Sequence, residues 1–96
     1  FHRKILECAQ NSTLLWIWDL LSLRVDRARY ASNLWPERWR KAMQEHERIL
    51  KCLSERNPKA TSLAMSDHVQ NGLSMVVRSL LQAQQLHPKS KRKPLA

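Results

Sequence analysis

The sequence predicts an all-α fold, an antiparallel helical bundle joined by short turns. Its 96 residues include a single glycine and four prolines, and so few helix-breaking residues are typical of long helices. Apolar residues recur at spacings of three and four, and no stretch alternates apolar and polar residues as a half-buried strand would.

Residues 1–9 are expected to form the closing turns of a helix, with Ile5 and Ala9 on one side. Asn11 then has the side chain of an N-cap for a second helix over residues 12–32. The first half of this second helix is apolar nearly all round, which predicts burial on several sides by other helices or by a second copy of the chain.

A third helix is expected to begin at Pro36, because proline is favoured in the first helical turn, and to extend to about Glu55. Its apolar residues share one face with His46, whereas Glu45 is expected on the opposite, charged face. The predicted inner face consists of Ala42, Met43, His46, Ile49, Leu50 and Leu53.

A fourth helix is expected to follow the Asn57-Pro58 pair and to reach Leu86. Its predicted apolar line comprises Leu63, Ala64, Met65, Val69, Leu73, Val76, Val77 and Leu80. Gly72 lies inside this helix at a cost of about 1 kcal/mol relative to alanine, which predicts that another group approaches closely there.

The net charge of +9 comes from 17 basic and 8 acidic residues. Four of the basic residues lie in the last eight positions, so residues 87–96 are expected to be a basic, flexible tail. The remaining basic residues are scattered over different helices, which argues against a nucleic-acid-binding face, although a basic helical nucleic-acid-binding module remains one alternative. No apolar run reaches the roughly 18 residues of a membrane span, so no membrane partner is expected.

Two cysteines, Cys8 and Cys52, form no CxxC pair and are too few for a disulfide scaffold. They are expected to be reduced, buried residues of a cytoplasmic protein.

The sequence lacks an initial methionine and begins as though within a helix, so we expect it to be part of a longer chain.

Three histidines are expected on the inner faces of three different helices: His2, His46 and His68. A single inward histidine is more often a hydrogen-bonded core residue than a ligand. Neutral imidazole is, however, the commonest side-chain ligand of zinc and nickel, and facing helices of a bundle often supply such ligands together. No HExxH or paired CxxC motif fixes the geometry, so both interpretations stay open.

Several short segments resemble the FCD domain, the effector-binding C-terminal domain of FadR-subfamily GntR-type transcription regulators. Phe1-His2 and residues 7–11 resemble its "FH…A…N" segment, and residues 45–50 are similar to its "EHxxIl" helix. Residues 57–60 and 65–69 look like its "D/N-x-x-A…M-x-x-H" helix. The separations between the three histidines, 44 and 22 residues, are also those expected in that family.

The resemblance implies a six- or seven-helix bundle of which residues 1–86 form the C-terminal four helices, a partial effector-binding and dimerisation domain. The N-terminal winged helix-turn-helix is absent from the sequence. The resemblance also implies a divalent metal, zinc or nickel, held by His2, His46, His68 and an aspartate four residues before His2. That aspartate would precede the first residue here, so weaker metal binding is expected.

The implied effector is a small carboxylate that meets an open coordination position of the metal. Arg24 could neutralise it, and Asn71 and Gly72 could line the same cavity. A homodimer is expected, with DNA bound only through the absent N-terminal domain and no enzymatic activity. The alternative is a metal-dependent hydrolase, which lacks an evident general base because Glu45 and Glu47 are expected to point away from His46.

Overall fold

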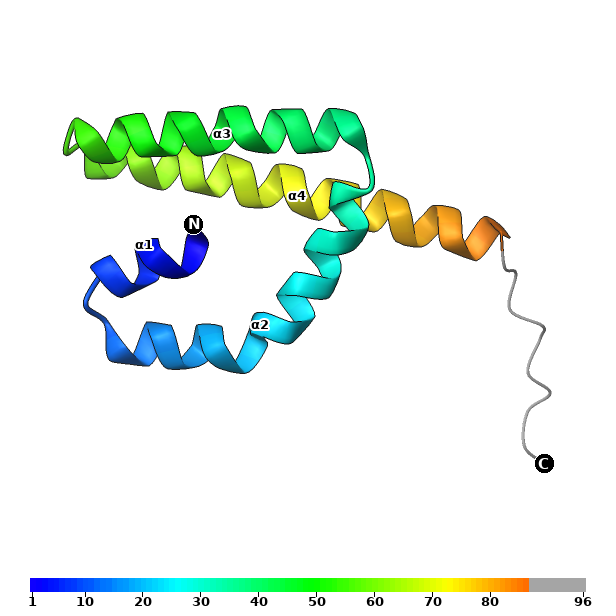
Figure 1. Cartoon of the computed structure of the whole chain (residues 1–96), viewed down its shortest axis with the longest axis horizontal. Coiled ribbons are helices and arrows are strands. Elements are labelled where there is room, and N and C mark those ends of the chain that lie inside the picture. The colour runs from blue at the N-terminus through cyan, green and yellow to red at the C-terminus, as the bar shows by residue number, and fades with distance from the viewer. Residues whose placement is uncertain (87–96) are drawn as a thin grey trace. The chain divides into compact units, whose positions relative to one another are not determined.

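The computed structural model describes residues 1–86, which contain four α-helices and no strand (Figure 1). The predicted all-α fold with short turns is therefore confirmed. The predicted tail, residues 87–96, lies outside the described residues. None of the helices in this part of the chain is long and apolar enough to cross a membrane. The helices are α1 (His2–Cys8), α2 (Ser12–Asn33), α3 (Pro36–Ser54) and α4 (Pro58–Leu86).

The described residues fall into two compact units, which divide between Tyr30 and Ala31. In the first unit, the side-chain oxygen of Asn11 accepts a hydrogen bond from the Leu14 amide at 3.0 Å, so the predicted N-cap of α2 is confirmed. Side chains of α1 also reach α2 in this unit. Arg3 Nη2 lies 3.4 Å from Asp19 Oδ2.

The first half of α2 keeps much of its apolar surface exposed. Trp16 is 63% exposed and Leu20 is 62% exposed, and Leu14, Ile17 and Leu21 are each more than 40% exposed. Within its own unit, α2 thus lacks the burial that the apolar pattern predicts.

In the second unit, α3 and α4 pack against each other as an antiparallel helical hairpin (Figure 1). A three-residue turn joins them, in which Arg56 adopts a left-handed backbone conformation with φ of 52°. The side chain of Asn57 then caps α4 by accepting a hydrogen bond from the Ala60 amide at 3.0 Å. Pro58 follows as the first helical residue, as predicted.

The interior of this hairpin combines apolar and polar side chains. Ile49 is fully buried and Ala64 is 2% exposed, and beside them Arg38 is 5% exposed and His68 is 8% exposed. Burial of a polar group destabilises the folded state unless the group is hydrogen-bonded, so polar partners are expected for Arg38 and His68.

The inner face of α3 differs from the predicted one. Met43, Leu50 and Leu53 are each at least 39% exposed, whereas Glu45 is turned toward the α4 side and only 17% of its side chain is exposed. The assignment of Glu45 to the charged outer face was therefore wrong. Helix α4 covers the edge of the apolar stripe that contains Glu45, and burial is tolerated there because Arg38 neutralises the carboxylate.

The inner line of α4 runs through Ala64, His68 and Gly72. The predicted apolar residues Leu63, Val69 and Leu73 are more than half exposed. A Cβ atom at Gly72 would lie 3.9 Å from Arg38 Nη2. Arg38 is thus the group that approaches this glycine, at an ordinary van der Waals distance that does not exclude a methyl group.

Candidate metal centre

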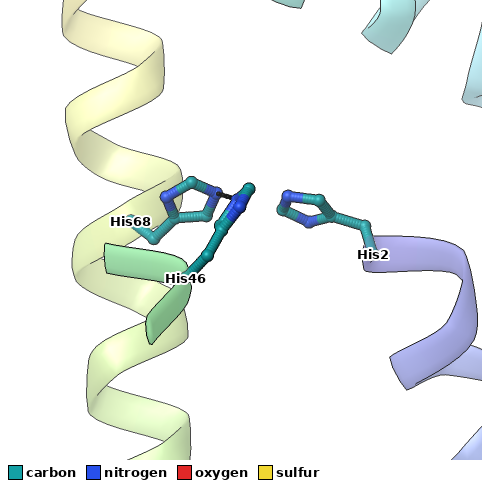
Figure 2. Close-up of side chains that lie close together, drawn as sticks. All are labelled: His2, His46 and His68. Carbon is teal, nitrogen blue, oxygen red and sulfur yellow. Dashed lines mark hydrogen bonds between the residues drawn. The ribbon is translucent and has the colours of Figure 1, made fainter. Parts of the chain in front are cut away.

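Two of the predicted ligands, His46 of α3 and His68 of α4, meet inside the hairpin (Figure 2). Their Nε2 atoms are 3.2 Å apart, and the ring centroids are 4.6 Å apart with planes inclined by 66°. His68 is buried and His46 is half-buried. The pairing of these two helices therefore brings together one ring nitrogen from each imidazole.

The separation of the two nitrogens fits a shared metal ion. Two histidine nitrogens bound tetrahedrally to one zinc ion, each about 2.0–2.1 Å from it, are about 3.3 Å apart. The observed 3.2 Å matches this geometry, and both histidines are candidate metal ligands. The same distance also fits a hydrogen bond between two neutral imidazoles, one donating and one accepting.

Glu45 lies behind His68 and favours the tautomer that a metal needs. Its Oε1 atom is 3.4 Å from His68 Nδ1, at the long end of the hydrogen-bonding range. A proton held on Nδ1 by the carboxylate leaves the lone pair of His68 Nε2 directed away from Glu45. A carboxylate behind a histidine is the usual arrangement around a metal-bound imidazole.

Arg38 and Asn71 hold Glu45 in this position. Arg38 Nη1 donates to both oxygens of Glu45, at 2.6 and 2.9 Å, and Asn71 Nδ2 donates to Oε2 at 3.3 Å. Burial raises the pKa of Glu45, but the hydrogen bonds from Arg38 and Asn71, with the charge of Arg38 and the hydrogen bond with His68, outweigh it and hold the pKa below its ordinary value. Glu45 is therefore a carboxylate at neutral pH.

The other predicted site residues are distributed over both units. Asn71 is exposed and joins the His46–His68 pair through Glu45, and Gly72 is half-buried opposite Arg38. His2 begins α1 in the first unit, where its ring is half-buried and stacks parallel to Trp18 at a centroid distance of 6.2 Å. Arg24 lies on α2 in the same unit and is exposed.

Arg38 and Glu45 are the two residues of this network that the sequence analysis missed. A signal for them was present, because Arg38, Ala42, Glu45 and Ile49 follow one another at spacings of four, three and four. This spacing places all four on one face of a helix. An oppositely charged pair on the same line as a buried isoleucine is a pattern that favours an internal ion pair.

The FCD domain family model matches residues 1–71, which is most of the chain and includes the three histidines, Glu45 and Asn71. This chain belongs to the FCD domain family. The FCD domain is the effector-binding domain of GntR-type transcription regulators, so the resemblance predicted from the short motifs is confirmed. No curated protein and no solved structure matches the chain.

Proposed function

We propose that this FCD domain senses a small carboxylate through a divalent metal ion, zinc or nickel, held by His2, His46 and His68. The observation that carries the proposal is the His46–His68 pair, whose Nε2 atoms are 3.2 Å apart. Imidazole nitrogens suit zinc and nickel better than they suit calcium or magnesium, which prefer oxygen ligands.

The surroundings of the pair support a metal centre rather than a simple hydrogen bond. A hydrogen bond between two core histidines needs no carboxylate behind one of them, whereas a metal ligand commonly has one. Glu45 occupies that position behind His68, and Arg38 and Asn71 orient it. The negative charge of Glu45 also offsets part of the charge that a divalent ion would bring into the hairpin.

His2 is proposed as the third ligand on the strength of the family resemblance, which carries this role onto it. Its own unit holds the ring in a defined setting, because Phe1 packs edge-on against it at 5.4 Å and Trp18 stacks parallel to it.

In this proposal the metal keeps an open coordination position that accepts the carboxylate of the effector. Asn71 and Gly72 line the approach beside Glu45, and Arg24 supplies a positive charge for the anion. Effector binding then shifts the equilibrium between arrangements of a homodimer in the cytoplasm, and that shift repositions DNA-binding domains elsewhere in the regulator.

We infer a regulatory rather than a catalytic role for the centre. Metal-dependent hydrolysis needs a general base that can take a proton near neutral pH. The pKa of Glu45 is lowered, and Arg38 and Asn71 engage its oxygens, so Glu45 is suited to orient His68 and not to accept a proton.

The test is metal binding by isothermal titration with Zn²⁺ and with Ni²⁺, on the wild-type chain and on the variants His46→Ala and His68→Ala. We expect one ion per chain in the wild type and an affinity lower by at least about 100-fold in each variant. His87→Ala removes the one histidine outside the proposed set and serves as the matched control. If all four proteins bind metal equally, the proposal is wrong.

A further inference from the structure

A second polar site lies in the α3–α4 hairpin, where a pocket of about 740 Å³ opens between the start of α3 and the second half of α4. Four of the ten lining residues carry cationic side chains, and Trp35 and Met75 contribute apolar surface. Its volume is within the range of about 300–1,000 Å³ that is typical of small-molecule sites. The cationic lining residues are Arg38, Arg40, Lys41 and Arg78.

The charges of this pocket do not balance. Arg38 is neutralised by Glu45, and Glu37 is the acidic residue in the lining. Among residues 1–86, no ion pair engages Arg40, Lys41 or Arg78, so these three cations exceed the single carboxylate. A concave surface with an excess of one charge concentrates its electric field and attracts ions of the opposite sign.

Trp35 gives one wall of the pocket a fixed geometry. Its indole nitrogen donates to Ser79 Oγ at 3.1 Å, and the guanidinium carbon of Arg78 lies 4.6 Å from the centre of its ring. A guanidinium group stacked on an aromatic ring keeps the N–H groups along its edge available for a carboxylate or a phosphate.

The backbone at the start of α3 adds to the positive potential. Trp35 occupies the N-cap position and makes no side-chain capping hydrogen bond, in contrast to Asn57 at the start of α4. The amides of the first turn carry partial positive charge and have no carbonyl partner within the helix. Glu37 and Arg38, whose amides belong to this turn, both line the pocket.

We propose that this pocket is a metal-independent binding site for a small organic anion with at least two negative charges, such as a dicarboxylate or a phosphorylated acid. After Glu37 is counted, the lining keeps an excess of two positive charges, which favours a dianion over a monoanion. The apolar part of such a ligand would pack on Trp35 and Met75.

The pocket shares two side chains with the histidine pair. Arg38 and Asn71 line it, and both donate hydrogen bonds to Glu45, which in turn contacts His68. An anion that draws Arg38 or Asn71 toward itself weakens their hold on Glu45. Occupancy of the pocket is therefore linked to the orientation of His68 through two hydrogen-bonded residues.

The experiment is isothermal titration of the metal-free chain with succinate and with inorganic phosphate, and with acetate as a monoanion. The chelator used to strip the metal is removed beforehand by gel filtration, because it is itself a polyanion. We expect saturable binding of both dianions that weakens with added salt, and binding of acetate that is weaker by about tenfold or more.

The double variant Arg40→Gln/Lys41→Gln is expected to bind succinate and phosphate about tenfold more weakly or worse. Both side chains belong to exposed residues, so the fold should tolerate the changes. The matched control is Lys51→Gln/Lys59→Gln, which removes two exposed positive charges outside the pocket. Equal weakening in the control, or the absence of saturable binding in the wild type, would overturn the proposal.

A comparison of metal-free and metal-loaded protein separates this site from the proposed metal centre. The pocket should still bind the dianions in His68→Ala, because His68 is not one of its lining residues. Binding that appears only with metal and disappears in His68→Ala would assign the anion to the metal ion and exclude the pocket. If the wild type takes up no metal when Zn²⁺ or Ni²⁺ is supplied and still binds the dianions, the pocket is supported and the metal-sensing proposal is contradicted.

Discussion

Arg38 and Glu45 lie seven residues apart on α3, and a single nitrogen of Arg38 donates to both carboxylate oxygens of Glu45, at 2.6 and 2.9 Å. Only 5% of the Arg38 side chain and 17% of the Glu45 side chain are exposed. The two charges are therefore largely removed from water and depend on each other, which gives the pair consequences for stability and for the candidate metal centre.

Replacement of Arg38 by methionine should destabilise the chain by about 3 kcal/mol, because the Glu45 carboxylate would stay in the hairpin without its cation. Urea denaturation followed by circular dichroism would measure the loss. The double variant Arg38→Met/Glu45→Gln should cost less than the sum of the two single variants, since both partners are then uncharged. Strict additivity would show that the two side chains do not interact in solution.

Glu45→Gln should lower the affinity for zinc by about 10–100-fold if His68 is a metal ligand, because a neutral amide orients and polarises the imidazole less well than a carboxylate does. Isothermal titration measures the change. Glu47→Gln is a matched control, since Glu47 also neighbours His46 but belongs to the exposed face of α3. An equal effect in both variants would point to a general charge effect and not to support of His68.

The stability of the metal-free chain should depend on pH through Glu45. Its pKa is lowered in the folded chain, so its contribution to stability is present above the ordinary carboxyl pKa of about 4.3. That contribution decreases as the pH falls below this value and is lost once the pH passes the folded-state pKa. The free energy of unfolding of the wild type minus that of Glu45→Gln should therefore shrink from pH 6 to pH 3. A constant difference would contradict the ion pair.

Gly72→Ala should stabilise the chain by about 1 kcal/mol, because alanine is the better helix former and its methyl group would meet Arg38 Nη2 only at 3.9 Å. Urea denaturation would show the gain. Gly72→Leu should lose this gain in stability, since the longer side chain would clash with the Arg38 guanidinium. Destabilisation by alanine would mean that a group beyond the described residues needs the space.

Asn57→Ala should cost about 1 kcal/mol, because the amide of Ala60 loses the side-chain oxygen that now accepts its hydrogen bond at 3.0 Å. Thermal unfolding would record the loss. Asn57→Asp should retain most of the stability, because its carboxylate can accept the same bond and lies favourably at the positive end of α4. If aspartate and alanine behave alike, the capping bond does not contribute.

The helix boundaries were predictable because their causes are local. Asn11 and Asn57 each cap the helix that follows, and Pro36 and Pro58 each occupy a first helical position, so the observed helices agree with the expected ones to within about two residues at each end. A cap and a proline act within a few residues of the chain, and neither depends on what the helix packs against.

The orientation of α3 was not predictable in the same way. Apolar spacing assigned Met43 and Leu50 to the interior and Glu45 to solvent, whereas α4 covers the side that contains Glu45. Periodicity reports where apolar side chains gather, but it treats a charged residue as exposed whether or not a partner neutralises it. Recognition of the site required Arg38 and Glu45 to be considered as an oppositely charged pair on the helix face that contains Ile49, and not as two separate charges.

Only part of the candidate site could be predicted from the sequence, for a related reason. His46 and His68 were expected on inner faces, and the hairpin does bring them together. The residues that support them were missed, because their role depends on contacts between α3 and α4. His2 and Arg24 belong to the other unit of the chain, so their part in the site stays a prediction.

The turn between α3 and α4 is only three residues long, and His46 and His68 are 22 residues apart in the chain. Closing so short a segment costs little loop entropy, and contacts between neighbours in sequence form early in folding. The two imidazoles should therefore come together as soon as the α3–α4 hairpin forms, before segments that are distant in sequence pack. A metal ion bound at that stage of folding would stabilise the hairpin while the rest of the chain folds.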